Sequence, residues 1–327
     1  MRFIPDITWH GAPIHGAALA IGIFDGVHLG HQKILQEGAE AGLPVMALTF
    51  DPHPTAIFAP DRVPTRLLTL KNRVHQLVMH GATAVAVLKF TEEFSRLSPE
   101  EFIDQIVMPI FDPKIVVVGE NFTFGAKAAG NVAFLKENTK LDVRGMPLLT
   151  HGGGTVSSTR IREAIRAGNL ETANQLLTRP HQIVGPVVHG EKRGRTIGYP
   201  TANIGLGNDA TIPSDGVYAG WLSVAGHKWP AAISIGTNPT FEGIRGRQVE
   251  AYALDRDDLD LYDQEATVEF GWRLRDTIKF DGLEPLRAAL YKISIGIPAQ
   301  YLRVCIYPIS RNIRVSVGQM PAKRDMI

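Results

Sequence analysis

ALAIGIFDGVHLGH, residues 18–31, starts as an apolar run and ends in a polar segment with glycine and histidine. The apolar pattern of residues 18–24 predicts a buried strand, and the residues from His28 onward are typical of the start of a helix. Similar apolar runs recur, with helix-like stretches between them, at 45–50, 84–88 and 115–118. This alternation predicts a parallel sheet that is covered on both faces and binds ligands beyond the carboxyl ends of its strands.

Further along the chain the pattern changes to short strands. Apolar spacing over residues 161–177 predicts two consecutive helices that close the first domain, and residues 178–181 look like a short linker. Strands are then expected at 183–188, 216–222, 231–235, 249–254 and 266–270. Brief strands separated by turn residues predict a small antiparallel β-barrel, followed by one helix over about residues 283–290.

Composition limits the classes of partner. The 327 residues carry 34 Lys and Arg against 33 Asp and Glu, so the chain lacks the basic surplus that nucleic acid or an anionic membrane would attract. No apolar run is long enough to cross a bilayer, and Asp6 and His10 interrupt the start where a secretory signal would need an apolar core. A single cysteine, Cys305, excludes an internal disulfide. We therefore expect a cytoplasmic protein without nucleic-acid or membrane partners.

Two histidines mark the first candidate site. His28 and His31 are three residues apart at the expected helix start, so both rings can face one side of its first turn. Free backbone N–H groups there favour anions, and Gly26 and Gly30 allow a close backbone approach. This combination suits charge stabilisation during displacement at an α-phosphate, without a covalent nucleophile. The alternative is that both histidines are structural. A zinc site is less favoured because no third ligand is clustered with them.

A second segment, SSTRIR at residues 157–162, strengthens the phosphate interpretation. It places three hydroxyls, on Ser157, Ser158 and Thr159, and two guanidiniums, on Arg160 and Arg162, at the start of another helix. Arginine can bind phosphate oxygens with two parallel hydrogen bonds. The alternative is a solvated helix N-terminus.

The second candidate site follows a glycine-rich loop, GRTIGYPTAN at residues 194–203. Neither this loop, with Gly194 and Gly198, nor the first has the Gly-Lys-Ser/Thr ending of a P-loop. Pro200 pre-shapes the loop, and beyond it Thr201 and Asn203 offer hard oxygen ligands on one side of a strand, which suits Mg²⁺.

Glu250 is the candidate general base of this second site. In the strand 249–254 it shares one face with Tyr252 and Leu254. If that face lies at the barrel mouth, its carboxylate could accept a proton from an attacking hydroxyl. The alternative is an exposed glutamate on a sheet.

The motifs in the first half resemble the FAD synthetase half of the bifunctional riboflavin kinase/FMN adenylyltransferase family. They are residues 22–31, TFDPHP at 49–54, GENFTFG at 119–125 and residues 157–162. This resemblance implies an α/β nucleotidyltransferase-type, Rossmann-like domain in which ATP phosphates contact His28, His31, Ser158 and Arg162. We also assign the rest of the two motifs to the ATP site: Gly22, Phe24, Asp25, Gly26, Gly30, Ser157 and Thr159.

The same resemblance implies a flavin and nucleotide pocket. We assign to it Asp51, His53, Pro54, Asn121 and Phe122. Asp51 and His53 could instead be turn residues beside prolines, and Asn121 a satisfied polar residue in a loop.

The second half resembles the riboflavin kinase module of that family over about residues 181–290. The shared motifs are residues 194–203, GVY at 216–218, GTNPTF at 236–241, VE at 249–250 and KFD at 279–281. The resemblance implies that Gly194, Gly198 and Pro200 shape the ATP loop. It also implies Thr201 and Asn203 at Mg²⁺-ATP, and Glu250 as the base for the ribityl 5′-hydroxyl. Asp263 stands where the family usually has glycine, and aspartate tolerates a left-handed turn.

Three regions follow from these assignments: an FMN adenylyltransferase domain at 1–178, a riboflavin kinase domain at 183–290 and an atypical tail at 291–327. The resemblance stops after Leu290, where Gly296 and Pro298 break the expected helix and a β-rich tail follows. We hypothesise an altered reading frame near residue 290. The alternative is an ordinary divergent terminus.

The resulting functional prediction is a two-step enzyme. It phosphorylates riboflavin to FMN, then transfers AMP from ATP to FMN, yielding FAD and pyrophosphate, with Mg²⁺ in both steps and ADP as the other product. A second copy of the chain, as in a homo-oligomer, is among the partners that the sequence allows. Two alternatives stay open: a nucleotidyltransferase for a nicotinate or pantetheine phosphate acceptor, and a flavin-binding protein whose kinase module is inactive.

Overall fold

The computed structural model describes residues 3–189, 201–207, 209–237, 247–254, 256 and 258–276. The chain divides into two compact units, residues 1–281 and residues 282–327. The second unit lies outside the described residues, and so does the helix expected over 283–290.

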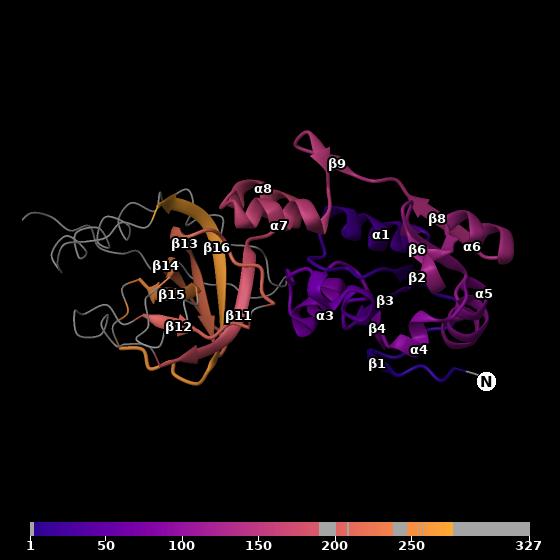
Figure 1. Cartoon of the computed structure of the whole chain (residues 1–327), viewed down its shortest axis with the longest axis horizontal. Helices are drawn as coiled ribbons and strands as arrows, with labels where there is room; N and C mark the ends of the chain where they lie inside the picture. Colours follow the sequence, from indigo (N-terminus) through magenta and orange to yellow (C-terminus); the bar gives the residue numbers. More distant parts are fainter. Residues whose placement is uncertain are drawn as a thin grey trace, which may run out of the picture. The chain divides into compact units, whose positions relative to one another are not determined.

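The first half of the chain contains a six-stranded sheet (Figure 1). Its strands, in spatial order, are β1 (Ile7–His10), β4 (Ala84–Lys89), β3 (Val45–Asp51), β2 (Ala18–Ile21), β5 (Ile115–Gly119) and β8 (Asp142–Met146). All neighbours are parallel except β1, which runs antiparallel to β4 at the edge. The four predicted strands are confirmed, although the first ends at Ile21 because the backbone turns at Gly22. The two edge strands were not predicted.

Both faces of this sheet are covered, as predicted. Alternate residues of β2 enter different hydrophobic cores, with Leu19 and Ile21 in one and Ala18 and Ala20 in the other. The first core also receives side chains from α4 (Glu92–Ser95), α5 (Pro99–Phe102), the π-helix η2 (Ile103–Phe111) and α6 (Val132–Asn138). The second core receives them from α1 (Leu29–Glu40) and α3 (Leu70–Met79). Because both faces of the sheet are buried, the central strands consist of continuous apolar runs.

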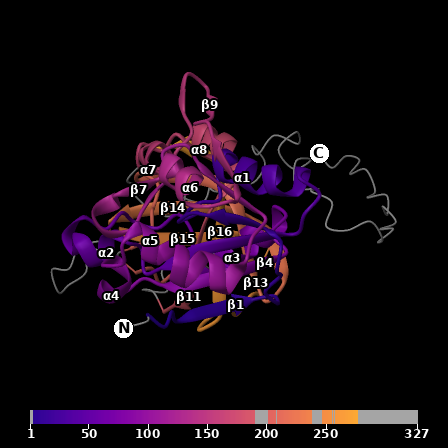
Figure 2. The same ribbon diagram turned by 90° about the vertical axis from the view of Figure 1, so that its right-hand side faces the viewer.

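Short elements border the carboxyl ends of the strands. They are α2 (Thr55–Phe58), the 3₁₀ turns η1 (Pro60–Arg62) and η3 (Ala126–Ala128), and the hairpins β6–β7 (Thr123–Phe124, Gly130–Asn131) and β9–β10 (Thr150–His151, Gly154–Thr155). The β9 hairpin projects from its surroundings in both ribbon views (Figure 2). The two predicted consecutive helices follow as α7 (Ser158–Arg166) and α8 (Leu170–Leu177).

The second half forms a closed antiparallel barrel, which confirms that prediction. The strand order is β11 (His181–Val188), β12 (Ala202–Ile204), β15 (Arg247–Ala253), β14 (His227–Thr237), β13 (Gly216–Val224) and β16 (Glu265–Arg275). Ile183, Val187, Ala251 and Phe270 are among the buried residues of its core. Asp263 takes a left-handed conformation, with φ 63°, as its position in the turn requires. No helix among the described residues is long and apolar enough to span a membrane.

Candidate functional sites

The two histidines of the first motif are stacked on each other. Their ring centroids lie 3.6 Å apart with an interplanar angle of 15°. His28 is the N-cap of α1, and its Nδ1 accepts a hydrogen bond from the backbone N–H of His31 at 3.4 Å. Burial lowers the pKa of His28 to about 4 and the pKa of His31 well below its usual value. Both imidazoles are therefore neutral at pH 7, with the proton of His28 assigned to Nε2 because Nδ1 accepts.

Asp25 joins three distant segments just before these histidines. Its buried carboxylate accepts hydrogen bonds from the backbone N–H groups of Leu67 and Leu68 and forms an ion pair with Arg162 at 2.5 Å. The backbone carbonyl of Asp25 accepts a hydrogen bond from the Ser158 hydroxyl at 2.8 Å. A buried ion pair with further hydrogen bonds fixes geometry, because losing either partner strands a charge. The motif around His28 and the start of α7 are thereby held together.

Glycine is required at one point of this loop. Gly26 has φ +90°, and a Cβ atom there would lie 2.8 Å from Cδ1 of Leu67. Any other residue would be strained by the backbone and crowded by Leu67. The loop can therefore close over the segment at 65–68 only with glycine at this position.

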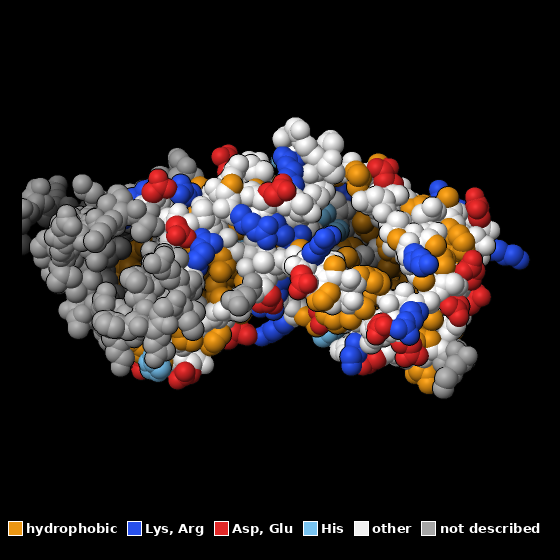
Figure 3. Space-filling view, viewed as in Figure 1, with side chains coloured by type: hydrophobic (Ala, Val, Ile, Leu, Met, Phe, Trp, Pro, Cys, Tyr) orange, Lys and Arg blue, Asp and Glu red, His pale blue; other side chains and the backbone are white. Residues whose placement is uncertain are grey.

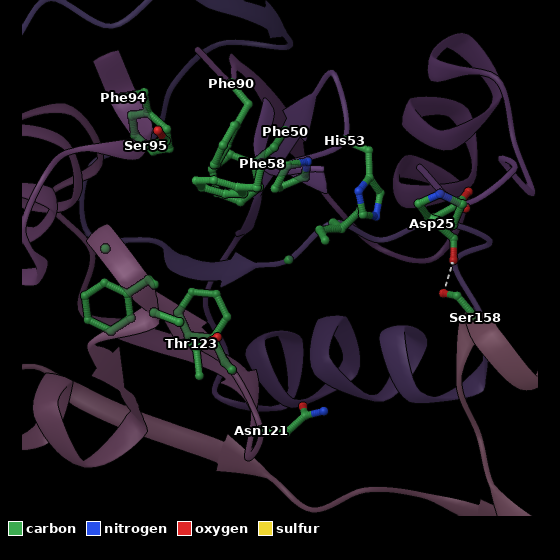
Figure 4. A pocket seen from close by; sticks show the side chains of 18 of the residues that line it. Asp25, Phe50, His53, Phe58, Phe90, Phe94, Ser95, Asn121, Thr123 and Ser158 are labelled. Carbon is green, nitrogen blue, oxygen red and sulfur yellow. Dashed lines mark hydrogen bonds between the residues drawn. The ribbon is translucent and has the colours of Figure 1, made fainter. Parts of the chain in front are cut away.

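A cavity of about 760 Å³ opens beside this loop. In the space-filling view, hydrophobic side chains gather around a hollow in the α/β half (Figure 3). One wall of the cavity is polar and includes His31, Ser158, Thr159 and Arg162. The other wall is aromatic. It consists of Phe50, Phe58, Phe90, Phe94, Phe102, Phe122 and Phe124. Figure 4 shows Phe90 and its neighbours on one side of the view, with Asp25 and Ser158 on the other.

The predicted residues of this site divide into those that line the cavity and those behind its wall. The lining residues are Gly22, Asp25, His31, His53, Pro54, Asn121, Phe122, Ser158, Thr159 and Arg162. The others lie outside that lining: Phe24, Gly26, His28, Gly30, Asp51 and Ser157. Among these, Ser157 is the N-cap of α7, and Phe24 is buried with its ring edge against His31. These residues shape the site from behind.

Asp51 is a second example of a residue behind the wall. Its carboxylate pairs with the buried guanidinium of Arg73 at 3.3 Å. Arg73 also donates to the backbone carbonyls of Ile23 and Phe50 at 3.2 and 3.1 Å. Burial lowers the pKa of Arg73, and Asp51 opposes that shift. This arrangement ties the ends of β2 and β3 together below the cavity.

The candidate residues of the barrel lie on neighbouring strands. Asn203 of β12 stands directly opposite Glu250 of β15, and Ser234 of β14 stands on the other side of Glu250. Residues paired in this way place their side chains on the same face of the sheet. That face is opposite the barrel core, which takes Val249 and Ala251 instead. Thr201 comes two residues before Asn203, whereas Gly194, Gly198 and Pro200 lie outside the described residues.

No group of three or more His, Cys, Asp or Glu side chains in the described part of the chain could hold a metal ion. The hydroxyl of Thr201 and the amide oxygen of Asn203 are hard donors, and such donors fit a divalent cation that arrives with phosphate oxygens.

Several residues of the first site were not predicted. Thr65 receives a hydrogen bond from Nε of Arg162 at 2.6 Å through its carbonyl, and Arg73 supports Asp51. Arg179, in the expected linker, donates to the carbonyl of Gly26 at 2.6 Å. None of them belongs to a local motif. Only their distant partners identify them.

The sequence matches two family models, one for each half. The FAD synthetase model matches residues 12–160, and the riboflavin kinase model matches residues 177–292. The second match ends close to Leu290, where the resemblance was expected to stop.

Relatives named bifunctional riboflavin kinase/FMN adenylyltransferase are similar over most of the chain. The protein from Listeria monocytogenes is 38% identical over 281 residues, which cover 84% of this chain and 89% of the relative. The Bacillus subtilis protein is 37% identical over 84% of this chain and 90% of its own length. The Escherichia coli protein is 37% identical over 85% and 91%, respectively.

A solved structure shares the fold. The crystal structure named as a macrolide-efflux protein from Streptococcus pneumoniae is 33% identical, with a TM-score of 0.79, and the match covers 88% of this chain and 95% of that one.

Proposed function

Because the chain belongs to the bifunctional riboflavin kinase/FMN adenylyltransferase family, we propose that each half carries one of the two reactions at the residues described above. The chain phosphorylates riboflavin to FMN and adenylylates FMN to FAD with release of pyrophosphate. One observation carries the assignment of the second reaction to the α/β half. A single cavity there joins a polar wall at the starts of α1 and α7 to an aromatic wall.

The polar wall is assigned to ATP. His31, Ser158 and Thr159 line it, and α7 starts at Ser158. The first backbone N–H groups of a helix have no partner within the helix, and Ser157 caps only the one on Arg160. Anions bind well at helix N-termini, where the helix dipole is positive. The Asp25–Arg162 ion pair keeps this wall in place.

The aromatic wall is assigned to the flavin ring. Phe90 packs edge-on against Phe50 at 5.9 Å, Phe58 at 5.8 Å and Phe94 at 5.2 Å. A large planar ring gains hydrophobic burial and favourable stacking against such side chains. Asn121 and His53 line the space between the walls and can orient polar groups of the substrates.

Adenylyl transfer then proceeds by positioning and charge stabilisation. A phosphate oxygen of FMN forms a bond to the α-phosphorus of ATP while the bond from that phosphorus to the bridging oxygen breaks. Pyrophosphate leaves with the bonding electrons. Neutral His31, which lines the cavity, can donate a hydrogen bond to oxygens on which negative charge develops, and His28 supports it by stacking from behind. No covalent intermediate is needed.

The barrel is assigned to phosphorylation. The riboflavin 5′-oxygen forms a bond to the γ-phosphorus as the bond to the leaving ADP oxygen breaks, and Glu250 takes the hydroxyl proton. Asn203, directly opposite, and Thr201 would hold Mg²⁺ together with ATP phosphates, where the ion neutralises phosphate charge. The family uses ATP and typically a divalent metal, and magnesium is our choice from the oxygen donors.

We place the enzyme in the cytoplasm, where ATP is available and the single cysteine of the sequence stays reduced. Its partners are small molecules: riboflavin, FMN, FAD, ATP, ADP and pyrophosphate.

A single substitution tests the division of labour. His31→Ala should reduce FAD formation from FMN by about 100-fold, because it removes the histidine that lines the cavity and can stabilise the developing charge. FMN formation from riboflavin should stay unchanged, as measured by chromatography of the flavins with Mg²⁺-ATP. His75→Gln, an exposed histidine on α3, is the control and should leave both rates unchanged. Equal loss of both activities in His31→Ala would contradict the assignment.

A further inference from the structure

Arg179 belongs to the segment that follows α8, yet its guanidinium folds back onto the loop that carries the two histidines. Nη2 donates to the carbonyl of Gly26 at 2.6 Å, and Nη1 donates to the carbonyls of Leu177 and Val27 at 2.9 and 3.4 Å. Val27 directly precedes His28. The guanidinium therefore fixes the backbone from which the stacked imidazoles start.

Arg179 is half-buried, and no carboxylate contacts it directly among the described residues. None of the described acidic side chains forms an ion pair with it, and its Nε is buried without a hydrogen-bond partner among the described atoms. Burial lowers its pKa to about 10, so it is still protonated at pH 7. The Asp25 carboxylate opposes this shift from a distance, but the direct partners of the guanidinium are backbone carbonyls, so an anion close by would stabilise the charge further.

This charge also acts on the histidines. Burial is the main reason why the pKa of His28 is low, and Arg179 lowers it further; for His31, burial and His28 act first and Arg179 adds to them. Gln32 supports the same backbone without a charge, donating to the Val27 carbonyl and the Thr178 hydroxyl, each at 2.9 Å. Arg179 therefore adds an electrostatic effect that Gln32 does not provide.

We propose that Arg179 is a positioning residue for adenylyl transfer, which holds the loop at Gly26 and Val27 and lends its positive charge to the binding of the ATP phosphates. The proposal rests on the assignment of adenylyl transfer to this cavity. Arg179 acts through the loop and through its field, because it is not among the residues that line the cavity.

Two substitutions separate the loop contacts from the charge. Arg179→Gln removes the charge and the loop contacts. Arg179→Lys keeps a positive charge but loses the planar guanidinium, which donates to the carbonyls of Gly26 and Leu177 at the same time. The control is Arg96→Gln, an exposed arginine after α4 whose ion pair within the described part of the chain is with exposed Glu92. All variants are assayed as full-length chains for FAD formation from FMN across pH, and for FMN formation from riboflavin.

We expect Arg179→Gln to reduce kcat/KM for ATP in adenylylation by about 100-fold and Arg179→Lys by about 10-fold, with the kinase rate unchanged. The acid limb of the adenylylation profile should move to higher pH in Arg179→Gln only, because without the positive charge the histidine pKa values rise.

Wild-type adenylylation in Arg179→Gln would overturn the proposal, as would equal losses in both variants with no shift of the acid limb. If Arg179→Gln fails to fold, Arg179→Lys decides: a selective loss of adenylylation supports the proposal and wild-type rates overturn it. His31→Ala in the same assay separates the two levels of inference. If that variant loses adenylylation and Arg179→Gln does not, only the role of Arg179 fails.

Discussion

The two candidate sites are assembled over very different distances along the chain. In the α/β half, Asp25 reaches Leu67 and, 137 residues away, Arg162. In the barrel, Asn203 and Glu250 meet because their strands pair residue by residue. The first site therefore depends on a few buried side-chain contacts, and the second on the register of a sheet.

This difference has a consequence for substitutions. Changes behind the first site should affect stability and adenylyl transfer together, because the same ion pair holds the fold and the cavity wall. Changes at the second site should affect chemistry with little loss of stability, because Asn203 and Glu250 lie on the face opposite the hydrophobic core. Four predictions test this contrast.

The largest effect is expected at Glu250. Glu250→Gln keeps the size of the side chain and removes the proton acceptor, so phosphorylation of riboflavin should fall by about 10³-fold. Adenylylation of FMN and the free energy of unfolding should stay unchanged. Glu265→Gln, an exposed carboxylate at the start of β16, is the control in the same flavin assay. A loss of adenylylation equal to the loss of phosphorylation would refute the contrast.

The next effect concerns the ion pair of the first site. Asp25→Asn leaves Arg162 buried without its counter-charge and should lower the free energy of unfolding by about 3 kcal/mol. Denaturant titration measures this change. Asp142→Asn breaks the half-exposed pair with Arg144 and should cost less than about 1 kcal/mol. Similar losses of unfolding free energy in the two variants would show that the Asp25–Arg162 pair contributes no more to stability than a half-exposed pair.

A pH titration compares the two halves directly. Burial lowers the pKa of His28 in the first half, and of His181 at the start of the barrel, to about 4. The unfolded chain binds these protons near pH 6.5 and the folded chain does not. Each histidine should therefore reduce the free energy of unfolding by about 2 kcal/mol between pH 6.5 and 5.

Variants of single histidines show how much each ring contributes to this pH dependence of the free energy of unfolding. His181→Gln should have a shallower decline of stability between pH 6.5 and 5, whereas His75→Gln, which is exposed, should keep the wild-type slope. Chemical denaturation at several pH values measures both. An unchanged slope in His181→Gln would mean that this buried ring is not neutral in the folded state.

The smallest effect is expected at the aromatic wall. Phe90→Leu removes edge-on contacts with Phe50, Phe58 and Phe94 and should raise KM for FMN about fivefold, at nearly constant kcat. Trp9→Leu on β1 removes a ring contact with Phe111, and because neither residue lines the cavity, KM should stay unchanged. Steady-state FAD formation gives both constants. A lowered kcat with unchanged KM would argue against flavin binding at this wall.

The sequence predicted the parts of the fold that have a local signature. Continuous apolar runs marked β3 and β5, because central parallel strands are buried on both faces. Alternation in residues 249–254 correctly separated Glu250 from Val249 and Ala251. The strand expected around Thr201 and Asn203 is present as β12, although it starts at Ala202 and its three residues are too few to show a period.

The contacts behind the first site could not be predicted, because no local pattern links the partners. Asp25 was assigned to the ATP site and lines the cavity, but the motif gave no sign that Leu67, Leu68 and Arg162 would bind its carboxylate. Arg179 looked like part of a linker because proline follows it. The aromatic wall is built from single phenylalanines spread over residues 50–124, each of which fits a core position on its own.

The most direct test of separate sites mixes two full-length variants, each of which has lost one of the two activities. His31→Ala and Glu250→Gln are each incubated with riboflavin and Mg²⁺-ATP, alone and together, and the flavins are separated by chromatography. Two independent pockets predict that His31→Ala accumulates FMN, that Glu250→Gln leaves riboflavin unchanged, and that the mixture makes FAD. A mixture that makes no FAD, although His31→Ala releases FMN, would contradict the account.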